Sequence, residues 1–125
     1  MTEVTTVEGG DFVGRASYED GVMTASLAGT ADYAALDAVE QVLGEVHAAA
    51  LRNSITDVRI DLAKLEFMNS SCFKCFVSWI GVLQDLPAGQ QYKVTFLSNP
   101  RMHWQKRSLH SLQCFAIDLI TVVQA

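Results

Sequence analysis

The spacing of apolar residues changes near the middle of the chain, and this change constrains the fold more than any other feature. Residues Val58–Leu62 alternate apolar and polar side chains, a pattern typical of a β-strand. From about Ser70 to Gln84 the apolar residues recur every three or four positions, which predicts a helix with one buried face. A strand followed along the chain by such a helix favours a βαβ unit and a partly parallel sheet.

The same reasoning predicts the other elements. Phe12 and Val13 begin a short strand, and the turn Glu19-Asp20-Gly21 joins it to a second strand, which together predict an opening β-hairpin. The remaining predicted elements are a helix from an Asp32 cap to about Leu51, a connection over Ala63–Met68, a strand over Tyr92–Leu97, a helix begun by Asn99-Pro100, and a last strand over Cys114–Val123. The fold class is therefore α/β, with a mixed central sheet of about five strands and helices packed on it.

The chain has 125 residues, half of them apolar, which suits one domain with a substantial core. Residues 1–10 are polar and end in two glycines, so we expect a flexible tail or a ragged first strand there. The single domain is then expected over residues 11–125.

Net charge and composition exclude several classes of function. A charge of −5 disfavours nucleic-acid and anionic-membrane surfaces. We see no secretory signal and no apolar run of the roughly 20 residues that a membrane-spanning helix needs. Three cysteines are too few for a disulfide framework, so a reduced, cytoplasmic location fits best. No cofactor or metal motif is recognisable.

The stretch Phe67–Cys75 concentrates reactive and polar groups where the central helix should begin. Helix starts expose unpaired N–H groups and carry partial positive charge, so they suit anions, phosphoryl groups and thiolates. One cap residue is needed, yet three candidates, Asn69, Ser70 and Ser71, stand in a row. Apolar Phe67 and Met68 precede them, which suggests an accessible hydroxyl beside an apolar docking patch.

Two cysteines in the same stretch allow a different chemistry. Cys72 and Cys75 form a C-x-x-C at a predicted helix start, where the helix dipole and Lys74 would lower a thiol pKa. The order of elements is not that of a thioredoxin, and buried cysteines are commonly just small apolar residues. A thiol redox protein is the less favoured interpretation.

Other enzyme or metal chemistry has weaker support. A zinc site would need Cys114, His103 or His110 as further ligands. The spacing of these residues matches no standard second ligand pair of a zinc-binding motif. No G-x-S-x-G elbow, as found in serine hydrolases, surrounds the serines. The simplest interpretation of all three histidines is that they are solvated surface residues. We therefore expect no enzyme activity.

The order of elements and the run Phe67-Met68-Asn69-Ser70-Ser71-Cys72-Phe73 resemble the STAS domain family, which includes anti-sigma factor antagonists. The exit from a strand through Leu97-Ser98-Asn99-Pro100 is similar as well. The resemblance covers nearly the whole chain. It implies a small α/β domain without catalytic activity of its own.

The resemblance also implies partners and a modification site. Antagonists of this family bind an anti-sigma factor that is a GHKL-type serine kinase, and a PP2C-type phosphatase reverses the phosphorylation. The serine before the motif glycine is Ser71 here. Asn69 replaces the motif aspartate and Cys72 the glycine. A related STAS-like group with the Asn-Ser-Ser run places the target at Ser70.

The main hypothesis is therefore a regulatory protein-interaction module that is switched by phosphorylation. Its partner would be bound through the start of the central helix, over Phe67, Met68, Asn69, Ser70, Ser71, Cys72, Phe73 and Lys74. The departures at Asn69 and Cys72 leave a phosphorylation-independent scaffold as the alternative. The sequence leaves the oligomeric state open, with a homodimer as one option.

Overall fold

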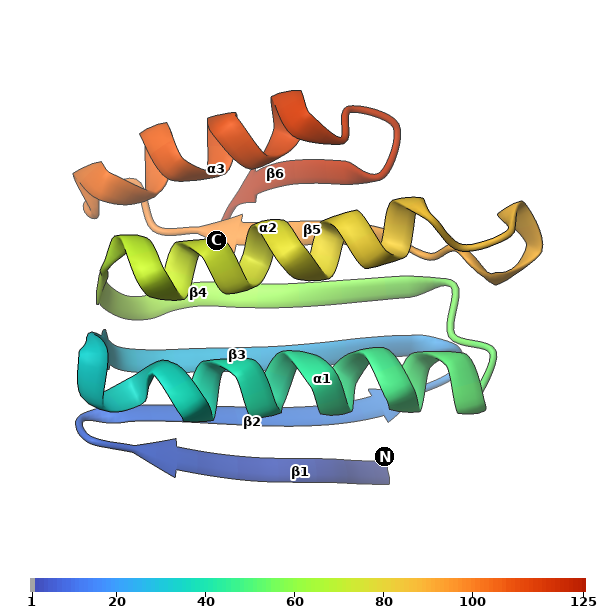
Figure 1. The fold of residues 1–125 in the computed structure, drawn as a ribbon, viewed down its shortest axis with the longest axis horizontal. Coiled ribbons are helices and arrows are strands. Elements are labelled where there is room, and N and C mark those ends of the chain that lie inside the picture. Colours follow the sequence, from blue (N-terminus) through green and yellow to red (C-terminus); the bar gives the residue numbers. More distant parts are fainter. Residues whose placement is uncertain (1) are drawn as a thin grey trace.

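The computed structural model describes the backbone of residues 2–125 and the side chains of residues 5–125. The chain folds into one layer of strands and one layer of helices (Figure 1). In chain order the elements are β1 (Thr2–Gly9), β2 (Phe12–Glu19), β3 (Val22–Ala31), the short 3₁₀ helix η1 (Tyr33–Ala35), α1 (Leu36–Arg52), β4 (Asp57–Met68), α2 (Ser70–Gln84), the 3₁₀ turn η2 (Ala88–Gln90), β5 (Lys93–Ser98), α3 (His103–Phe115) and β6 (Ile120–Gln124).

The strands lie in the sheet in their sequence order, from β1 at one edge to β6 at the other. β1, β2 and β3 pair antiparallel, whereas β3, β4, β5 and β6 run parallel, so the sheet is mixed as predicted. The predicted hairpin is confirmed as β2 and β3, with Asp20 and Gly21 at positive φ in its turn.

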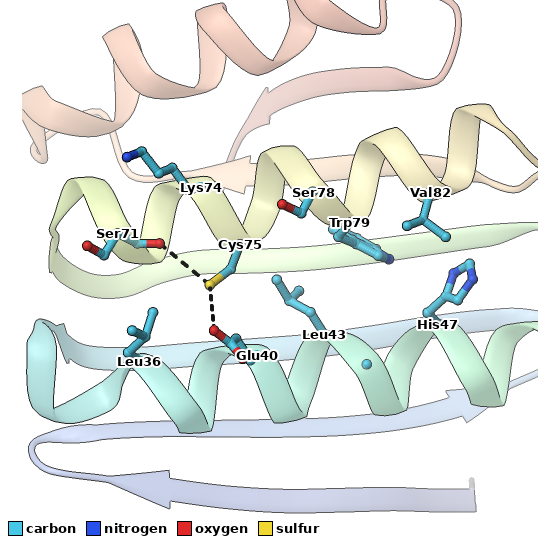
Figure 2. A pocket seen from close by; sticks show the side chains of 11 residues that line it. Leu36, Glu40, Leu43, His47, Ser71, Lys74, Cys75, Ser78, Trp79 and Val82 are labelled. Carbon is cyan, nitrogen blue, oxygen red and sulfur yellow. Dashed lines mark hydrogen bonds between the residues drawn. The ribbon is translucent and has the colours of Figure 1, made fainter.

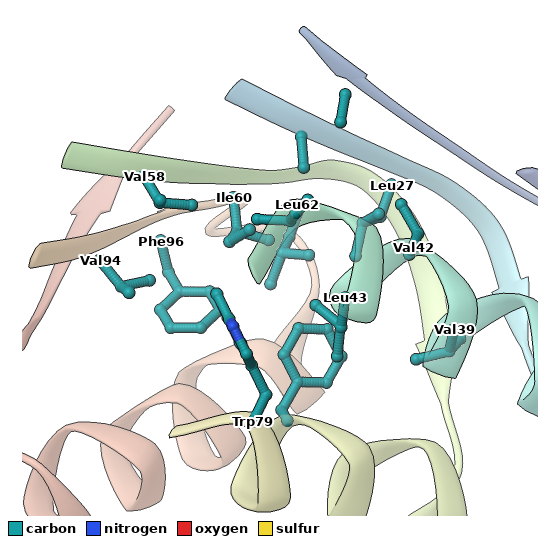
Figure 3. Close-up of a cluster of buried hydrophobic side chains, with 14 of the residues drawn as sticks. Leu27, Val39, Val42, Leu43, Val58, Ile60, Leu62, Trp79, Val94 and Phe96 are labelled. Carbon is teal, nitrogen blue, oxygen red and sulfur yellow. The ribbon is translucent and has the colours of Figure 1, made fainter. Parts of the chain in front are cut away.

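The core lies between the helices and one face of the sheet (Figure 3). Alternate residues of each strand point into it, such as Leu27, Ile60 and Phe96, and they meet Val42 of α1 and Trp79 of α2. Among residues 5–125, the opposite face carries half-buried and exposed side chains, so the described core lies on the helix side of the sheet. Because α1 and α2 pack against each other over this sheet, their facing sides form the main helix–helix contact.

The amino-terminal prediction needs correction. Residues Thr2–Gly9 form β1 and pair along β2, so a flexible tail over residues 1–10 is wrong for this part, while the ragged first strand describes it better. A register shift between Glu3 and Thr5 interrupts the pairing. The sheet formed by residues 2–125 consequently has six strands instead of about five. A low-hydropathy strand forms here because an edge strand needs apolar side chains on one face only.

Three element boundaries also differ from the predictions. β4 continues to Met68, so the expected connection over Ala63–Met68 is a strand that pairs with β3. α3 begins at His103 rather than at Asn99-Pro100. Cys114 and Phe115 end that helix, and the last strand begins only at Ile120. The bounds of α2, Ser70–Gln84, agree with the prediction.

Candidate functional site

The carboxyl ends of the parallel strands gather the polar residues that begin the next elements. Asp32 follows β3, Asn69 follows β4 and Asn99 follows β5. Each side chain accepts a backbone N–H a few residues on: Ala34 N to Asp32 at 3.1 Å, Cys72 N to Asn69 at 2.8 Å and Arg101 N to Asn99 at 2.9 Å. This edge of an α/β sheet is where ligands and partners commonly bind.

Of the three candidate cap residues in the sequence, Asn69 is the one that caps α2. Its backbone is extended, its Oδ1 accepts the Cys72 N–H, and its carbonyl accepts the Phe73 N–H at 3.0 Å. The Asn69 N–H in turn donates to Ala31 O at 2.9 Å, which ties the start of α2 to the end of β3. With the cap role filled by Asn69, neither serine hydroxyl is needed to begin the helix.

Ser70 and Ser71 occupy the first two positions of α2, and they differ in exposure. Ser70 is exposed, whereas Ser71 is half-buried and lines a groove towards α1. Lys74 is exposed one turn further on, and no acidic residue lies in the first turn of α2. An anion on either hydroxyl would therefore meet the positive end of the helix dipole and one neighbouring cation.

Apolar side chains surround this helix start. Phe67 is 47% exposed at the end of β4, and Met68 and Phe73 are half-buried. Tyr33 stands at helical spacing from Leu36, which would predict a place on the buried face of the first helix, but it is 82% exposed in η1. The registers Thr30↔Phe67 and Ala31↔Met68 bring the end of β3 and η1 beside the end of β4 and α2. The structure thus adds Tyr33 to the predicted docking patch.

A groove of about 480 Å³ runs between α1 and α2 from this patch (Figure 2). Leu36 and Leu43 of α1 form one wall, and Trp79 and Val82 of α2 form the other. Its polar lining includes Ser71, Lys74, Glu40 and His47. In Figure 2, Ser71 lies near one end of the groove and His47 near the other. The α1 wall was missed by sequence reasoning because no local motif indicates which helices pack together.

His47 is not the solvated surface residue that the sequence suggested. Its Nδ1 lies 2.7 Å from the hydroxyl of Tyr92, which also accepts the Trp79 Nε1–H at 2.8 Å. In the neutral imidazole, the Tyr92 hydroxyl donates to Nδ1 when that nitrogen is unprotonated, and the Nδ1–H donates to the hydroxyl in the other tautomer. Burial lowers the pKa of His47, which favours this neutral form. His103 and His110 are exposed, as expected.

The two thiols of the C-x-x-C pair point inward from α2. Cys72 is fully buried and its Sγ donates to Asp32 O at 3.5 Å. Cys75 is half-buried, with Ser71 O at 3.5 Å and Glu40 Oε1 at 4.0 Å from its Sγ. Burial, followed by the charges of Cys75, Asp32 and Glu40, raises the pKa of Cys72 to about 11, and burial together with Glu40 raises that of Cys75. This is the reverse of the shift that a reactive thiol needs.

The structure does not bring the proposed zinc ligands together with this pair. Cys114 lies 3.5 Å from His110, but both are on α3 and exposed, whereas Cys72 is buried under α2. Across the described part of the chain, no three His, Cys, Asp or Glu side chains are grouped as they would be around a metal ion. Nor does any helix in that part combine the length and apolarity required to cross a membrane.

Comparison with known proteins gives a clear answer for the fold. The sequence matches no family model and no curated protein. Among solved structures, an anti-sigma factor antagonist from Mycobacterium paratuberculosis is similar at a TM-score of 0.63, with 20% identity over 91% of this chain and 86% of that one.

The anti-sigma factor antagonist SpoIIAA in its unphosphorylated form is similar at a TM-score of 0.58, with 18% identity over 90% of this chain and 88% of that one. The Bacillus cell fate determinant SpoIIAA in the phosphorylated form is similar at 0.56, with 16% identity over 89% and 91% of the two chains. The chain therefore has the STAS-type fold of the anti-sigma factor antagonists.

Proposed function

We propose that this protein is a non-enzymatic regulatory module of the anti-sigma factor antagonist type, whose partner binding is switched by phosphorylation at Ser71 or Ser70. The observation that carries the proposal is the start of α2. There Asn69 caps the helix, and two hydroxyls that the fold does not use stand beside exposed apolar side chains. Proteins of this fold are known in unphosphorylated and phosphorylated forms, which supports the assignment.

The two departures from the family motif are compatible with a switch. Asn69 acts through its side-chain oxygen as a cap, a role that aspartate fills equally well. The Cys72 side chain is turned into the core towards Asp32, so its bulk does not stand in front of the hydroxyls. Asn69 and Cys72 therefore make their contacts within the domain and do not cover the two hydroxyls.

Phosphorylation would change the surface more than the fold. A phosphate brings a charge of about −1.5 to −2 and three acceptor oxygens. The free N–H groups at the start of α2 and the Lys74 ammonium favour that charge, so the domain stays folded. The same charge on Ser71 stands at the mouth of the α1/α2 groove, where an apolar anchor of the partner would otherwise be desolvated.

We place the partner over the patch of Tyr33, Phe67, Met68 and Phe73 and the adjoining groove, with an anti-sigma factor of the GHKL kinase type as the partner class. A binding penalty of about 3 kcal/mol from the desolvated phosphate would weaken the complex roughly 100-fold. A PP2C-type phosphatase would restore the binding form.

The test is phosphorylation by the cognate anti-sigma factor of the GHKL kinase type. The purified protein is incubated with that kinase and ATP, and the modified peptide is located by mass spectrometry. We expect phosphate on Ser71, or on Ser70. The variants Ser70→Ala and Ser71→Ala each remove one acceptor and identify it.

A matched variant separates charge from position. Ser111→Glu introduces a carboxylate at an exposed serine of α3, outside both the patch and the groove. It should leave partner binding unchanged, whereas Ser71→Glu should weaken it. If neither serine is modified, and binding tolerates Ser70→Glu and Ser71→Glu, the protein is a phosphorylation-independent scaffold instead.

A further inference from the structure

A second groove lies at the opposite edge of the sheet from β1, between α3 and β6. Its volume is about 930 Å³, and it shares no lining residue with the groove between α1 and α2. One side is formed by His103, Lys106, Arg107 and His110, which recur at helical spacing along one face of α3. The other side is formed by β6.

The β6 side of this groove presents unused backbone groups. Within residues 2–125, β6 pairs with β5 alone, and this pairing is parallel. The Val94 N–H donates to Leu119 O, and the Ala125 N–H donates to Ser98 O. These two bonds show that the odd-numbered residues of β6 face β5. Strand alternation therefore turns the N–H and C=O groups of Val122 and Gln124 away from the sheet, and both residues line the groove.

The charge of the groove is opposite to that of the whole molecule. The chain carries 14 acidic against 9 basic residues, yet residues 86–117 contain Lys93, Arg101, Lys106 and Arg107 and no Asp or Glu. None of the described residues that line the groove has a carboxylate side chain. Val122 and Val123 add apolar surface from β6. A negatively charged, extended chain would meet complementary charge along α3 and hydrogen-bond partners along β6.

From this arrangement we infer that the α3/β6 groove binds an extended, acidic segment of a partner protein, which adds to the sheet as a seventh strand beside β6. Strand addition supplies main-chain hydrogen bonds, and pockets for alternate side chains supply specificity. A strand as long as β6 spans about 17 Å, at roughly 3.3 Å per residue. The inference does not depend on phosphorylation at α2, because the two grooves have separate linings.

The probe is a displayed library of random nine-residue peptides, selected on the full-length protein at moderate salt. We expect the bound peptides to be enriched in Asp and Glu together with β-branched residues. The double variant Lys106→Glu/Arg107→Glu should weaken a selected peptide at least tenfold, because it reverses two exposed charges of the groove. The control Arg15→Glu/Arg59→Glu makes the same charge change on strands away from the groove and should leave affinity unchanged.

A backbone variant tests strand addition separately from charge. Gln124→Pro removes an N–H that points away from β5, so the sheet can keep its pairing while the groove loses a donor. It should weaken the peptide several-fold. Hydrogen exchange should show slower exchange of the Val122 and Gln124 amides when the peptide is bound.

Three results would overturn the inference. The first is a set of selected peptides without acidic enrichment. The second is equal affinity of a selected peptide for the Lys106→Glu/Arg107→Glu variant and the original protein. The third is unchanged exchange of the Val122 and Gln124 amides when the peptide is bound. Sedimentation analysis covers a fourth outcome. If the protein self-associates and Lys106→Glu/Arg107→Glu abolishes this, the groove receives another copy of the chain rather than a separate partner.

Discussion

The starts of α2 and α3 follow neighbouring parallel strands, and both carry an asparagine, but they are built differently. Asn69 caps α2 directly, and the helix begins at the next residue. Asn99 instead closes a turn with Arg101, and its Nδ2 donates to Ala63 O at 2.9 Å. α3 begins four residues later, after Met102, with no side-chain cap.

The difference arises because the end of β4 has backbone carbonyls that β5 does not pair with. The pairing of β4 with β5 ends at Asp61↔Leu97, although β4 continues to Met68. Gln105 is completely buried beyond that point, and its Nε2 donates to Leu62 O at 2.7 Å and Leu65 O at 3.0 Å. The start of α3 is thus used to complete a strand. The Ser70 and Ser71 hydroxyls at the start of α2 have no such role, which leaves them available for a partner or a phosphate.

The largest expected effect is on the α3 side. Gln105→Leu would remove both donors to β4 and the acceptor of the Asn99 N–H at 2.8 Å. Buried groups left unpaired should lower the free energy of unfolding by about 3 kcal/mol. Urea unfolding measures the change. Gln113→Leu makes the same replacement at a half-buried position of α3 and should change the free energy by less than about 0.5 kcal/mol. Equal effects of the two changes would contradict the role of Gln105.

The thiols of Cys72 in α2 and Cys114 in α3 should differ in their rates of alkylation. With its pKa raised from 9.0 to about 11, Cys72 should form thiolate roughly 100-fold less than an unshifted cysteine near neutral pH, and burial slows its reaction further. Cys114 is exposed and should be alkylated first. Mass spectrometry after timed iodoacetamide treatment at pH 8 gives the order.

The same pKa shift predicts a pH dependence of stability. The folded state holds the Cys72 proton more tightly than the unfolded chain, so this stabilisation is complete below pH 9 and is lost as the pH rises towards 11. Unfolding midpoints measured from pH 8 to 11 should fall over that interval. In the alkylation experiment above, rapid reaction of Cys72 with iodoacetamide in the folded protein would contradict a raised pKa and favour the thiol redox interpretation.

A smaller effect is expected at the α2 cap. Asn69→Ala removes the acceptor of the Cys72 N–H and should cost about 1 kcal/mol in unfolding free energy. Asn69→Asp keeps the acceptor and adds a charge that the helix dipole favours, so its stability should equal or exceed that of the original protein. Thermal unfolding of the two variants tests the assignment. A loss of stability in Asn69→Asp would show that the amide group itself is needed.

The smallest expected effect on stability comes from a negative charge placed at Ser70 or Ser71. Ser70→Glu and Ser71→Glu should each change the unfolding free energy by only a few tenths of a kcal/mol, because the helix dipole offsets the cost of the added charge. Equilibrium unfolding checks this. A loss above about 2 kcal/mol in either variant would mean that the α2 start cannot carry a phosphate without damage to the fold.

The bounds of α2 could be predicted because the strand period before it, the helical period within it and a run of three possible cap residues agree there. Sequence reasoning failed at α3 because Asn99-Pro100 has the residue types of a helix start but serves a turn. Gln105 escaped notice because a buried glutamine has no apolar signature, and only its contacts with β4 reveal it. Tyr33 fitted the helical period, yet the short 3₁₀ helix turns it outward.

The candidate site was predictable only on one side. The segment Phe67–Lys74 is contiguous in sequence, so its position at the helix start could be inferred. The α1 wall of the groove, with Leu36, Glu40 and His47, comes from helix packing across a parallel crossover, which no local pattern indicates. The hydrogen bond between His47 and Tyr92 joins residues 45 positions apart and was likewise beyond sequence reasoning.

The most direct test of the central claim is the dissociation constant of the kinase-type anti-sigma factor for the unmodified and the singly phosphorylated protein, with circular dichroism confirming that both are folded. We predict that phosphate at the start of α2 weakens the complex about 100-fold while the fold is retained. Equal affinity of the two folded forms would contradict it.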